Sequence, residues 1–304
     1  MAVALNTTSQ FSDPVLRGSV YGTFKAYNEG KDEVWKKCGY KEIETSKPFE
    51  EFAEFATLGL APRQNDGQQA TTDLVKEGYV FRVNVYLYGI NLPVSTIALK
   101  SKDLRDAISG TKAVGESLYN TREILHADLF ANAFSTTVGL LPDALPSCTA
   151  SDKLPRGGTM NNLLSGASFA ESTFESAFIL ADKMPGGHGI PVGQEIKTLL
   201  IPPEYRFEAI RILKSELQSQ TANNATNALR LEAGSIKVVR NRFFGSSTNF
   251  FFGTDADLGL VSIWLQKPEV EEVGMNLTKS VVFYGSQIVG IGCINRRCLI
   301  GSNI

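Results

Sequence analysis

The feature that most restricts the fold is a predicted helix of unusual length, over residues 102–137. Asp103 can cap its start, and apolar side chains recur along it at helical spacing. These side chains are Leu104, Ile108, Leu118, Leu125 and Leu129. Gly110 and Gly115 weaken the helix. At about 1.5 Å per residue it would span roughly 50 Å, which is long for a globular core and more typical of a spine across a flat molecule.

The segment before this helix predicts a long β-hairpin. Residues 79–87 alternate between two kinds of side chain, which is the period of a strand with one apolar face. A turn at Gly89-Ile90-Asn91 and a second strand from Pro93 to Leu99 would complete the hairpin. A long hairpin directly before a helix start is expected to project from the body.

Two further predictions concern the chain upstream of the hairpin. The segment 46–60 predicts a short amphipathic helix, because Pro48 suits a first helical position and phenylalanines follow at 49, 52 and 55. Residues 1–45 are polar and irregular, which favours an arm over a packed unit.

The second half of the chain mixes helices and strands. Ser168 and Glu171 form a capping-box pattern that predicts a helix. Residues 199–201 predict the end of a buried strand, stopped by Pro202-Pro203, and a helix to about Gln218 follows. The last third is rich in strands separated by turns. The fold class predicted is therefore α+β, with no internal repeat.

The strand–Pro-Pro–helix unit was tested for chemistry because such units often hold a phosphate or a nucleophile. A phosphate-binding turn needs glycines and free backbone N–H groups, and two prolines remove two of them. A nucleophile elbow needs a small-residue turn around Ser or Cys, which is absent here. The unit is interpreted as structural.

Composition excludes several classes of function. Lys plus Arg number 30 and Asp plus Glu 32, so the charge gives no reason to expect strong binding to nucleic acid or acidic membranes. The four cysteines form no C-x-x-C pair, and with two histidines they give no zinc-site spacing. They are expected to be free thiols in a reducing compartment. The N-terminus does not resemble a signal peptide, and no apolar run could span a membrane.

Each remaining candidate residue is better explained without chemistry. His188 in GGHG is interpreted as a loop residue and His126 as a packed or rim side chain of the long helix. Asp255 and Asp257, with Gly253 and Gly259, lack the ligand series of a calcium loop and suit a surface turn. The remaining groups are Glu269, Glu271 and Glu272, expected at a solvated strand end; Phe250, Phe251 and Phe252, expected in a core strand; and the pairs Arg240/Arg242 and Arg296/Arg297, expected on the solvated surface. No catalytic, cofactor-binding or metal-binding residue is predicted, and the chain is interpreted as a scaffold.

The order of several stretches resembles the major capsid proteins of tailed bacteriophages, specifically the Mu-like head subunits, which share the Hong Kong ninety-seven type fold. The resemblance covers roughly residues 40–302, and no single motif is diagnostic. The stretches are VKEGYVFRVNVYLYGINLPVSTIAL, LRDAISGTKAVGESLYNTREILHADLFANAF, LPRGGTMNNLLSGASFAESTFESAF, IKTLLIPPEYRFEAIRILKS, TANNATNALR, STNFFFGTDADLGL and YGSQIVGIGCINRRCLIGS.

The resemblance implies a division of the chain and a set of partners. It implies an N-terminal arm over 1–45, an extended β-hairpin loop over 46–100, a peripheral domain with the spine helix over 101–196 rejoined by parts of 230–304, and a mainly axial domain over 197–290. The subunit would self-assemble into pentamers and hexamers of an icosahedral head around double-stranded DNA. Expected partners are a portal protein at one vertex, scaffolding and decoration proteins, and the packaged DNA through non-specific contacts, but no membrane.

The resemblance places the protein in the virion, after assembly in the cytoplasm of a bacterial host. Some members of the family carry a long N-terminal scaffolding region, which is not seen here, so a separate scaffold or none is implied. Two alternatives stay open: the shell of an encapsulin-like nanocompartment, and a soluble hydrolase using His188 with an acidic partner.

Overall fold

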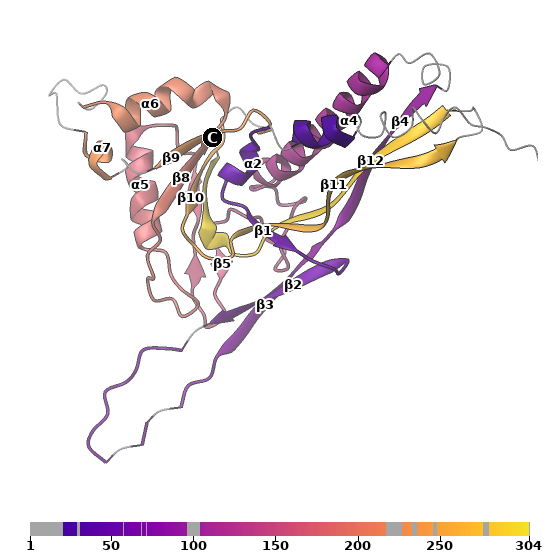
Figure 1. Ribbon diagram of the computed structural model, residues 1–304. Helices are drawn as coiled ribbons and strands as arrows, with labels where there is room; N and C mark the ends of the chain where they lie inside the picture. The colour runs from indigo at the N-terminus through magenta and orange to yellow at the C-terminus, as the bar shows by residue number, and fades with distance from the viewer. Residues whose placement is uncertain are drawn as a thin grey trace, which may run out of the picture.

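The structure is a computed structural model that describes residues 21–28, 31–56, 58–67, 69–70, 72–95, 104–216, 227–232, 236–245, 248–275 and 280–303. Two sheets with separate helical covers form the body, and a two-stranded ribbon, β2–β3, projects from it (Figure 1).

The first sheet supports the long helix. Its strand order is β1 (Lys41–Glu44), β11 (Leu260–Met275), β12 (Ser280–Cys293) and β4 (Tyr86–Ser95). Helix α4 (Leu104–Ala131) packs on β12 and β4 and runs along the sheet (Figure 1). It approaches closely at Gly285, where a Cβ would meet the side chain of Val114. The predicted long helix is confirmed and ends earlier than predicted, at Ala131, whereas its predicted start with the proposed cap, Asp103, lies outside the described residues.

The second sheet forms a separate core. Its strand order is β7 (Leu163–Ser165), β13 (Leu299–Asn303), β10 (Phe250–Thr254), β8 (Ile196–Ile201) and β9 (Lys237–Arg240). Helices α5 (Glu171–Asp182), α6 (Arg206–Lys214) and α7 (Ala228–Glu232) lie beside it (Figure 1). A two-stranded ribbon, β5 (Asp152–Lys153) with β6 (Thr159–Met160), and the short helix η3 (Arg296–Cys298) also belong to the body.

Strand β10 joins the two halves of the body. Phe250 and Phe252 face the core beneath α5, where they pack against Phe174. Phe251 faces the other way and packs against Phe130 of α4. Because successive side chains of a strand point to opposite faces, the apolar triplet fits a strand covered on both sides. The prediction of a core strand is confirmed.

The strand–Pro-Pro–helix unit is a packing element. Strand β8 ends at Ile201, and a short 3₁₀ turn, η1 (Pro203–Tyr205), leads into α6. The helix ends at Lys214, earlier than predicted, and buries Ala209, Ile212 and Leu213. The spacing of Phe207, Ile210, Leu213 and Leu217 predicts one apolar face for this helix, but Phe207 and Ile210 are exposed.

The ribbon that projects from the body differs from the predicted hairpin. Strand β2 (Phe49–Ala56) pairs antiparallel with β3 (Lys76–Asn84), and β4 pairs with β12 instead of folding back on β3. The helix predicted over 46–60 and the turn predicted at 89–91 are both wrong. Spacing of three between the phenylalanines suited a helix, but the ladder to β3 and a register shift between Ala53 and Phe55 accommodate them in a strand.

The chain before β1 is packed, so the expectation of an unpacked arm is wrong for this part. Residues 21–28 are helical, and α2 (Val34–Lys37) lies against α4. Trp35 is 1% exposed. The Glu123 carboxylate accepts a hydrogen bond from Val34 N at 2.8 Å. Residues 1–20 lie outside the described part of the chain.

The capping box predicted at Ser168 is also wrong. Helix α5 begins at Glu171, and the residue before it is Ala170. Ser168 instead accepts a hydrogen bond from Thr173 Oγ1 through its carbonyl oxygen at 2.7 Å. The pattern was displaced by two residues from the true start of the helix.

Candidate assembly surface

The projecting ribbon carries the two most exposed large apolar side chains of the described residues near its outer end. Leu60 is 80% exposed and Leu74 is 75% exposed. Phe55, Leu58 and Val75 are also mostly exposed. Isolated exposed apolar residues are common on protein surfaces. A group of them at the end of a projection is different, and is typical of a surface that a partner covers. We call these five residues the hairpin tip.

One charged contact holds the loop behind the tip. Arg156 Nη1 forms an ion pair with Asp73 at 2.8 Å, and its Nη2 donates to the Leu74 carbonyl oxygen. Gly59 N donates to Asp73 Oδ2 at 2.8 Å. The hydrogen bond from Gly59 N and the Arg156 guanidinium lower the pKa of Asp73 to about 2. Both sides of the loop, near 59 and near 73, are therefore tied to the segment at Arg156.

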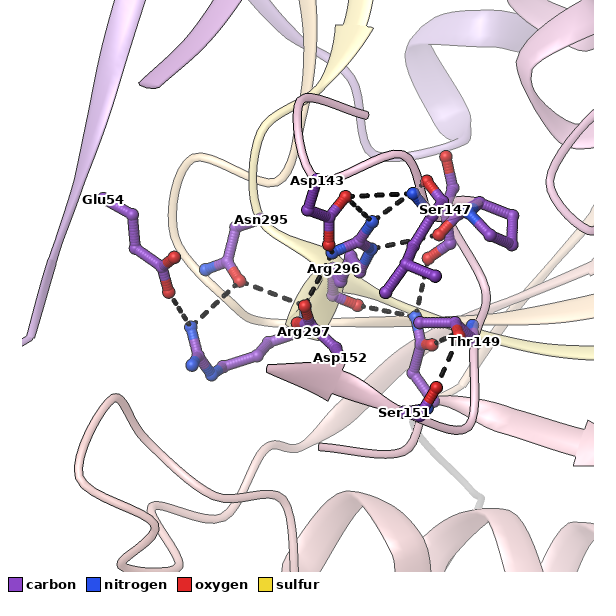
Figure 2. A network of polar contacts seen from close by, with 12 residues as sticks. Glu54, Asp143, Ser147, Thr149, Ser151, Asp152, Asn295, Arg296 and Arg297 are labelled. Atoms are coloured by element: carbon purple, nitrogen blue, oxygen red, sulfur yellow. Dashed lines mark hydrogen bonds and ion pairs between the residues drawn. The ribbon is translucent and has the colours of Figure 1, made fainter. Parts of the chain in front are cut away.

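A buried network around Arg296 joins three segments of the body (Figure 2). The Arg296 guanidinium contacts both oxygens of Asp143, at 2.6 and 2.7 Å, and Asp152 Oδ1 at 2.6 Å. It also donates to the carbonyl oxygens of Leu145 and Pro146. The prediction that Arg296 lies on the solvated surface is wrong, because its side chain is 3% exposed.

Electrostatics follow this geometry. Burial would lower the pKa of Arg296, but Asp143 and Asp152 outweigh it and raise that pKa. Burial would likewise raise the pKa of Asp143, and hydrogen bonds from Arg296 bring it below its ordinary value. For Asp152, burial dominates and the pKa is raised. Asp143 and Asp152 both bind the same guanidinium, so the buried charges are paired and hydrogen-bonded. This arrangement suits a structural role.

Arg297 links the network to the ribbon. Its Nε donates to the Pro185 carbonyl oxygen at 2.9 Å, and its Nη1 lies 3.5 Å from Glu54 Oε1 of β2. Figure 2 shows Glu54 reaching Arg297 from the side opposite Asp143. Burial raises the pKa of Glu54, opposed by the Arg297 charge. The surface prediction is thus wrong for Arg297 as well, whereas Arg240 and Arg242 are exposed as predicted.

His126 lies fully buried in the C-terminal part of α4. Its Nδ1 is 2.7 Å from the Arg122 carbonyl oxygen and donates to it, so Nε2 accepts from Ser262 Oγ at 3.0 Å. Trp35 stacks on the ring at 4.2 Å between centroids. Burial lowers the pKa of His126 to about 4. The expectation of a packed histidine is confirmed.

This buried histidine predicts a stability that depends on pH. The unfolded chain binds a proton at His126 near pH 6.5, whereas the folded chain binds it only near pH 4, so stability falls as pH drops through this window. In urea unfolding, we expect the advantage of the wild type over His126→Gln to shrink by about 2 kcal/mol between pH 7 and pH 5. A constant difference across this range would contradict the assignment.

The other candidate residues are dispersed. His188 is half-buried in the loop between α5 and β8, and Asp255 and Asp257 lie in an exposed turn before β11. Asp255 Oδ1 accepts from Glu195 N at 2.9 Å. The acidic residues 269, 271 and 272 follow one another along β11. Within the described ranges, no group of three His, Cys, Asp or Glu side chains is placed to hold a metal ion.

The four cysteines are buried free thiols, as predicted. Burial raises the pKa of Cys38 to about 12 and raises the pKa of Cys148 strongly. Such thiols carry almost no thiolate at neutral pH, so they act as small apolar core residues.

Comparison with known proteins decides the family. A model of the phage capsid protein family matches residues 83–301, which include α4, most of both sheets and the Arg296 network. The chain belongs to the phage capsid protein family. It is a structural shell protein and not an enzyme, and its α+β architecture is the Hong Kong ninety-seven type capsid fold.

Solved structures of capsids and related shells share this fold at low sequence identity. The virus-like particle from Pyrococcus furiosus has a TM-score of 0.56 at 12% identity, covering 93% of this chain and 97% of that chain. The capsid of cyanophage P-SCSP1u has a TM-score of 0.53 at 16% identity, covering 86% of this chain and 85% of that chain. The SrpI encapsulin from Synechococcus elongatus PCC 7942 has a TM-score of 0.55 at 9% identity, covering 90% and 87%.

Two further observations concern the capsid protein. No curated protein sequence matches it significantly. Among the helices that the structure describes, none is long and apolar enough to cross a membrane.

The Arg296 network is the feature that sequence reasoning missed. The signal available was weak: two adjacent arginines close to the C-terminal end of the chain, with Asp143 and Asp152 about 150 residues away. Only the fold brings these groups together.

Proposed function

We propose that this capsid protein is the major subunit of a tailed-phage head, and that it self-assembles into pentamers and hexamers that close into an icosahedral shell around double-stranded DNA. The observation that carries the proposal is the hairpin tip, whose apolar side chains the described part of the chain leaves mostly exposed. Covering these side chains with a neighbouring subunit would remove them from water at about 25 cal/mol per Å².

The geometry suits repeated contacts between copies. The hairpin tip and the body surface it would cover are different patches, so each subunit offers one and accepts the other. Contacts of this head-to-tail kind close into rings when the rotation between subunits allows it. Each copy of the subunit in a pentamer or hexamer would then use the same pair of surfaces.

The finer assignments belong to the same proposal. Residues 1–45 would form an arm, whose described part packs against α4 of its own subunit, and the region 46–100 would form the extended loop, with β4 joined to the body sheet. The region 101–196 with parts of 230–304 would form the peripheral domain, and 197–290 mainly the axial domain. The ordered stretches quoted above support a Mu-like head subunit. Portal, scaffolding and decoration proteins and packaged DNA would be the partners, with assembly in the cytoplasm of the bacterial host.

A nanocompartment shell is the second candidate, because the fold resembles that of the SrpI encapsulin. The two differ in what they enclose. A head subunit packages DNA, whereas a nanocompartment encloses a protein cargo.

Assembly of the purified chain tests the proposal. We expect megadalton particles, or pentamers and hexamers, in light scattering and negative-stain microscopy. A 33.1 kDa monomer that stays monomeric at high concentration and high salt would contradict a shell role. Co-purified DNA would favour the head, and a co-purified protein cargo would favour the nanocompartment.

A further inference from the structure

Besides the ion pairs of Glu54 and Asp73, two close contacts hold the ribbon against its own body, and the first is at its root. There, a Cβ at Gly290 of β12 would collide with the Asn84 carbonyl oxygen. A Cβ at Gly292 would lie 2.6 Å from Val83 Cγ2. The absence of two side chains therefore lets β3 cross directly over β12, and Val83 is 7% exposed as a result.

The second place is near the outer end of the ribbon, at the last residue of β2. Ala56 is 0% exposed, although its neighbour Phe55 is 62% exposed. The residue that covers Ala56 is Gly187, in the loop between α5 and β8. A Cβ at Gly187 would lie 2.9 Å from Ala56 Cβ and 3.0 Å from Ala56 Cα. The backbone of the loop thus touches the backbone of the ribbon.

The loop at Gly187 is well held, so it can act as a stop. Gly186 N donates to the Ile190 carbonyl oxygen at 2.8 Å, and Val192 N donates to that of Met184 at 3.0 Å. Arg297 binds the Pro185 carbonyl oxygen, and Arg156 N donates to that of Gly187. The ribbon is tied to the body at this end by side-chain ion pairs, Arg156 with Asp73 and Arg297 with Glu54, which can follow a small shift, so a collision displaces the ribbon rather than the backbone-bonded loop.

The distance between the root and the contact at Ala56 determines how far the ribbon turns when this contact changes. Asn84 pairs with Phe49 at the root and Lys76 pairs with Ala56 at the outer contact, so seven residues of β2 separate the two places. At about 3.3 Å per residue this is roughly 23 Å. Relieving the collision of one added methyl, a shift of about 1 Å, would turn the ribbon by about 2.5°, and the loop beyond it would move by about 2 Å.

We propose that Gly187 and Ala56 form a stop that presets the direction of the ribbon in the free subunit, and that this direction determines the curvature of the shell. The second half of the inference rests on the proposed function. Gly187 is therefore a positioning residue: it lies against the ribbon of its own subunit, and it acts on the neighbouring subunit through the hairpin tip. The proposal gives a role to the Gly-Gly-His-Gly loop at 186–189, which contains Gly187.

A small set of variants tests the stop in the free subunit. Gly187→Ala inserts a methyl group into the contact, and Ala56→Gly removes one. The double variant relieves the clash between the two Cβ atoms but leaves the one with Ala56 Cα. Gly22→Ala is the matched control, since a Cβ there has no atom within 4 Å. Nitroxide labels at Asp66→Cys and Glu175→Cys report the distance between loop and body, because both positions are exposed and the native cysteines are buried.

We expect the label distance to shift by about 2 Å in Gly187→Ala, to return part of the way in the double variant, and to stay unchanged in Gly22→Ala. Assembled Gly187→Ala particles should differ from the wild type in mean diameter or in the width of the size distribution. An unchanged distance overturns the stop, and a shifted distance with unchanged particles overturns its link to curvature.

Two further outcomes remain decisive. If Gly187→Ala does not fold, Ala56→Gly takes its place, and a label distance distribution no broader than that of the wild type overturns the stop. If the wild type itself forms no particles, the proposed function fails, while the distances in the free subunit still decide whether the stop exists.

Discussion

Replacing Arg296 with alanine is expected to lower the free energy of unfolding by about 3–5 kcal/mol. The guanidinium is buried and bonded to Asp143, Asp152 and two backbone carbonyl groups. Its removal leaves two buried carboxylates and two carbonyl oxygens without their donor. Most of the lost stability comes from these unpaired groups, because breaking a buried ion pair leaves an uncompensated charge in a poorly solvated site.

Urea unfolding of the purified subunit at pH 7 measures this loss. Arg240→Ala is the matched control, because Arg240 is exposed at the end of β9 and is expected to change stability by less than about 0.5 kcal/mol. Arg296→Lys is expected to retain little of the stability, since an ammonium group cannot bond both Asp143 oxygens as the planar guanidinium does. A loss below about 1 kcal/mol in Arg296→Ala would contradict the role assigned to the network.

The network also shows where sequence reasoning stops. Helix α4 was predictable because local periodicity reports which side of a helix is buried, and the strand at Phe250–Phe252 because a short continuous apolar run suits a strand covered on both faces. Arg296 and its acids come from three segments, and nothing in their local sequence distinguishes a buried arginine from a solvated one. Burial of a charge is decided by tertiary pairing, which a pattern along the chain does not contain.

The wrong helix at 46–60 has a related cause. Phenylalanines at every third position suit a helix face, and the segment is also rich in glutamate, which favours helix. In the structure, β3 offers this segment a ladder of backbone hydrogen bonds, and most of its side chains stay partly exposed in a projecting ribbon. In β2 only Ala56 is fully buried, so this strand has no continuous buried face and period-two alternation was not there to be found in it. The pairing of strands could not be predicted from local sequence either, because β4 pairs with β12, almost 200 residues away.

The candidate assembly surface was predicted in kind but not in place. The sequence pointed to a long projecting hairpin before α4, and the structure has one, but it is built from β2 and β3 instead of from residues 79–99. Its apolar tip comes mostly from residues between the strands, a stretch that reads as polar loop apart from scattered leucines. Only their common exposure at the end of the ribbon marks them as a surface.

Placing charges on this tip should abolish assembly and leave the subunit folded. In the double variant Leu60→Asp and Leu74→Asp, both substituted side chains are mostly exposed in the free subunit, so its thermal midpoint should change by less than about 2 °C. In a shell they would be buried against a neighbour, and burying an unpaired carboxylate costs several kcal/mol at every copy of the contact. Particle yield in light scattering should therefore fall at least tenfold.

The control adds the same charges to the same loop without removing apolar contacts. Gln64→Asp with Gln69→Asp places two carboxylates at exposed polar positions, and we expect this variant to assemble close to the wild-type yield. If the control also fails, charge repulsion near the loop explains the loss and the apolar contact is not needed. If Leu60→Asp with Leu74→Asp assembles normally, the tip is not covered by a neighbour, and the shell must be held together by other surfaces, of which the exposed Phe207 and Ile210 on α6 are the first to test.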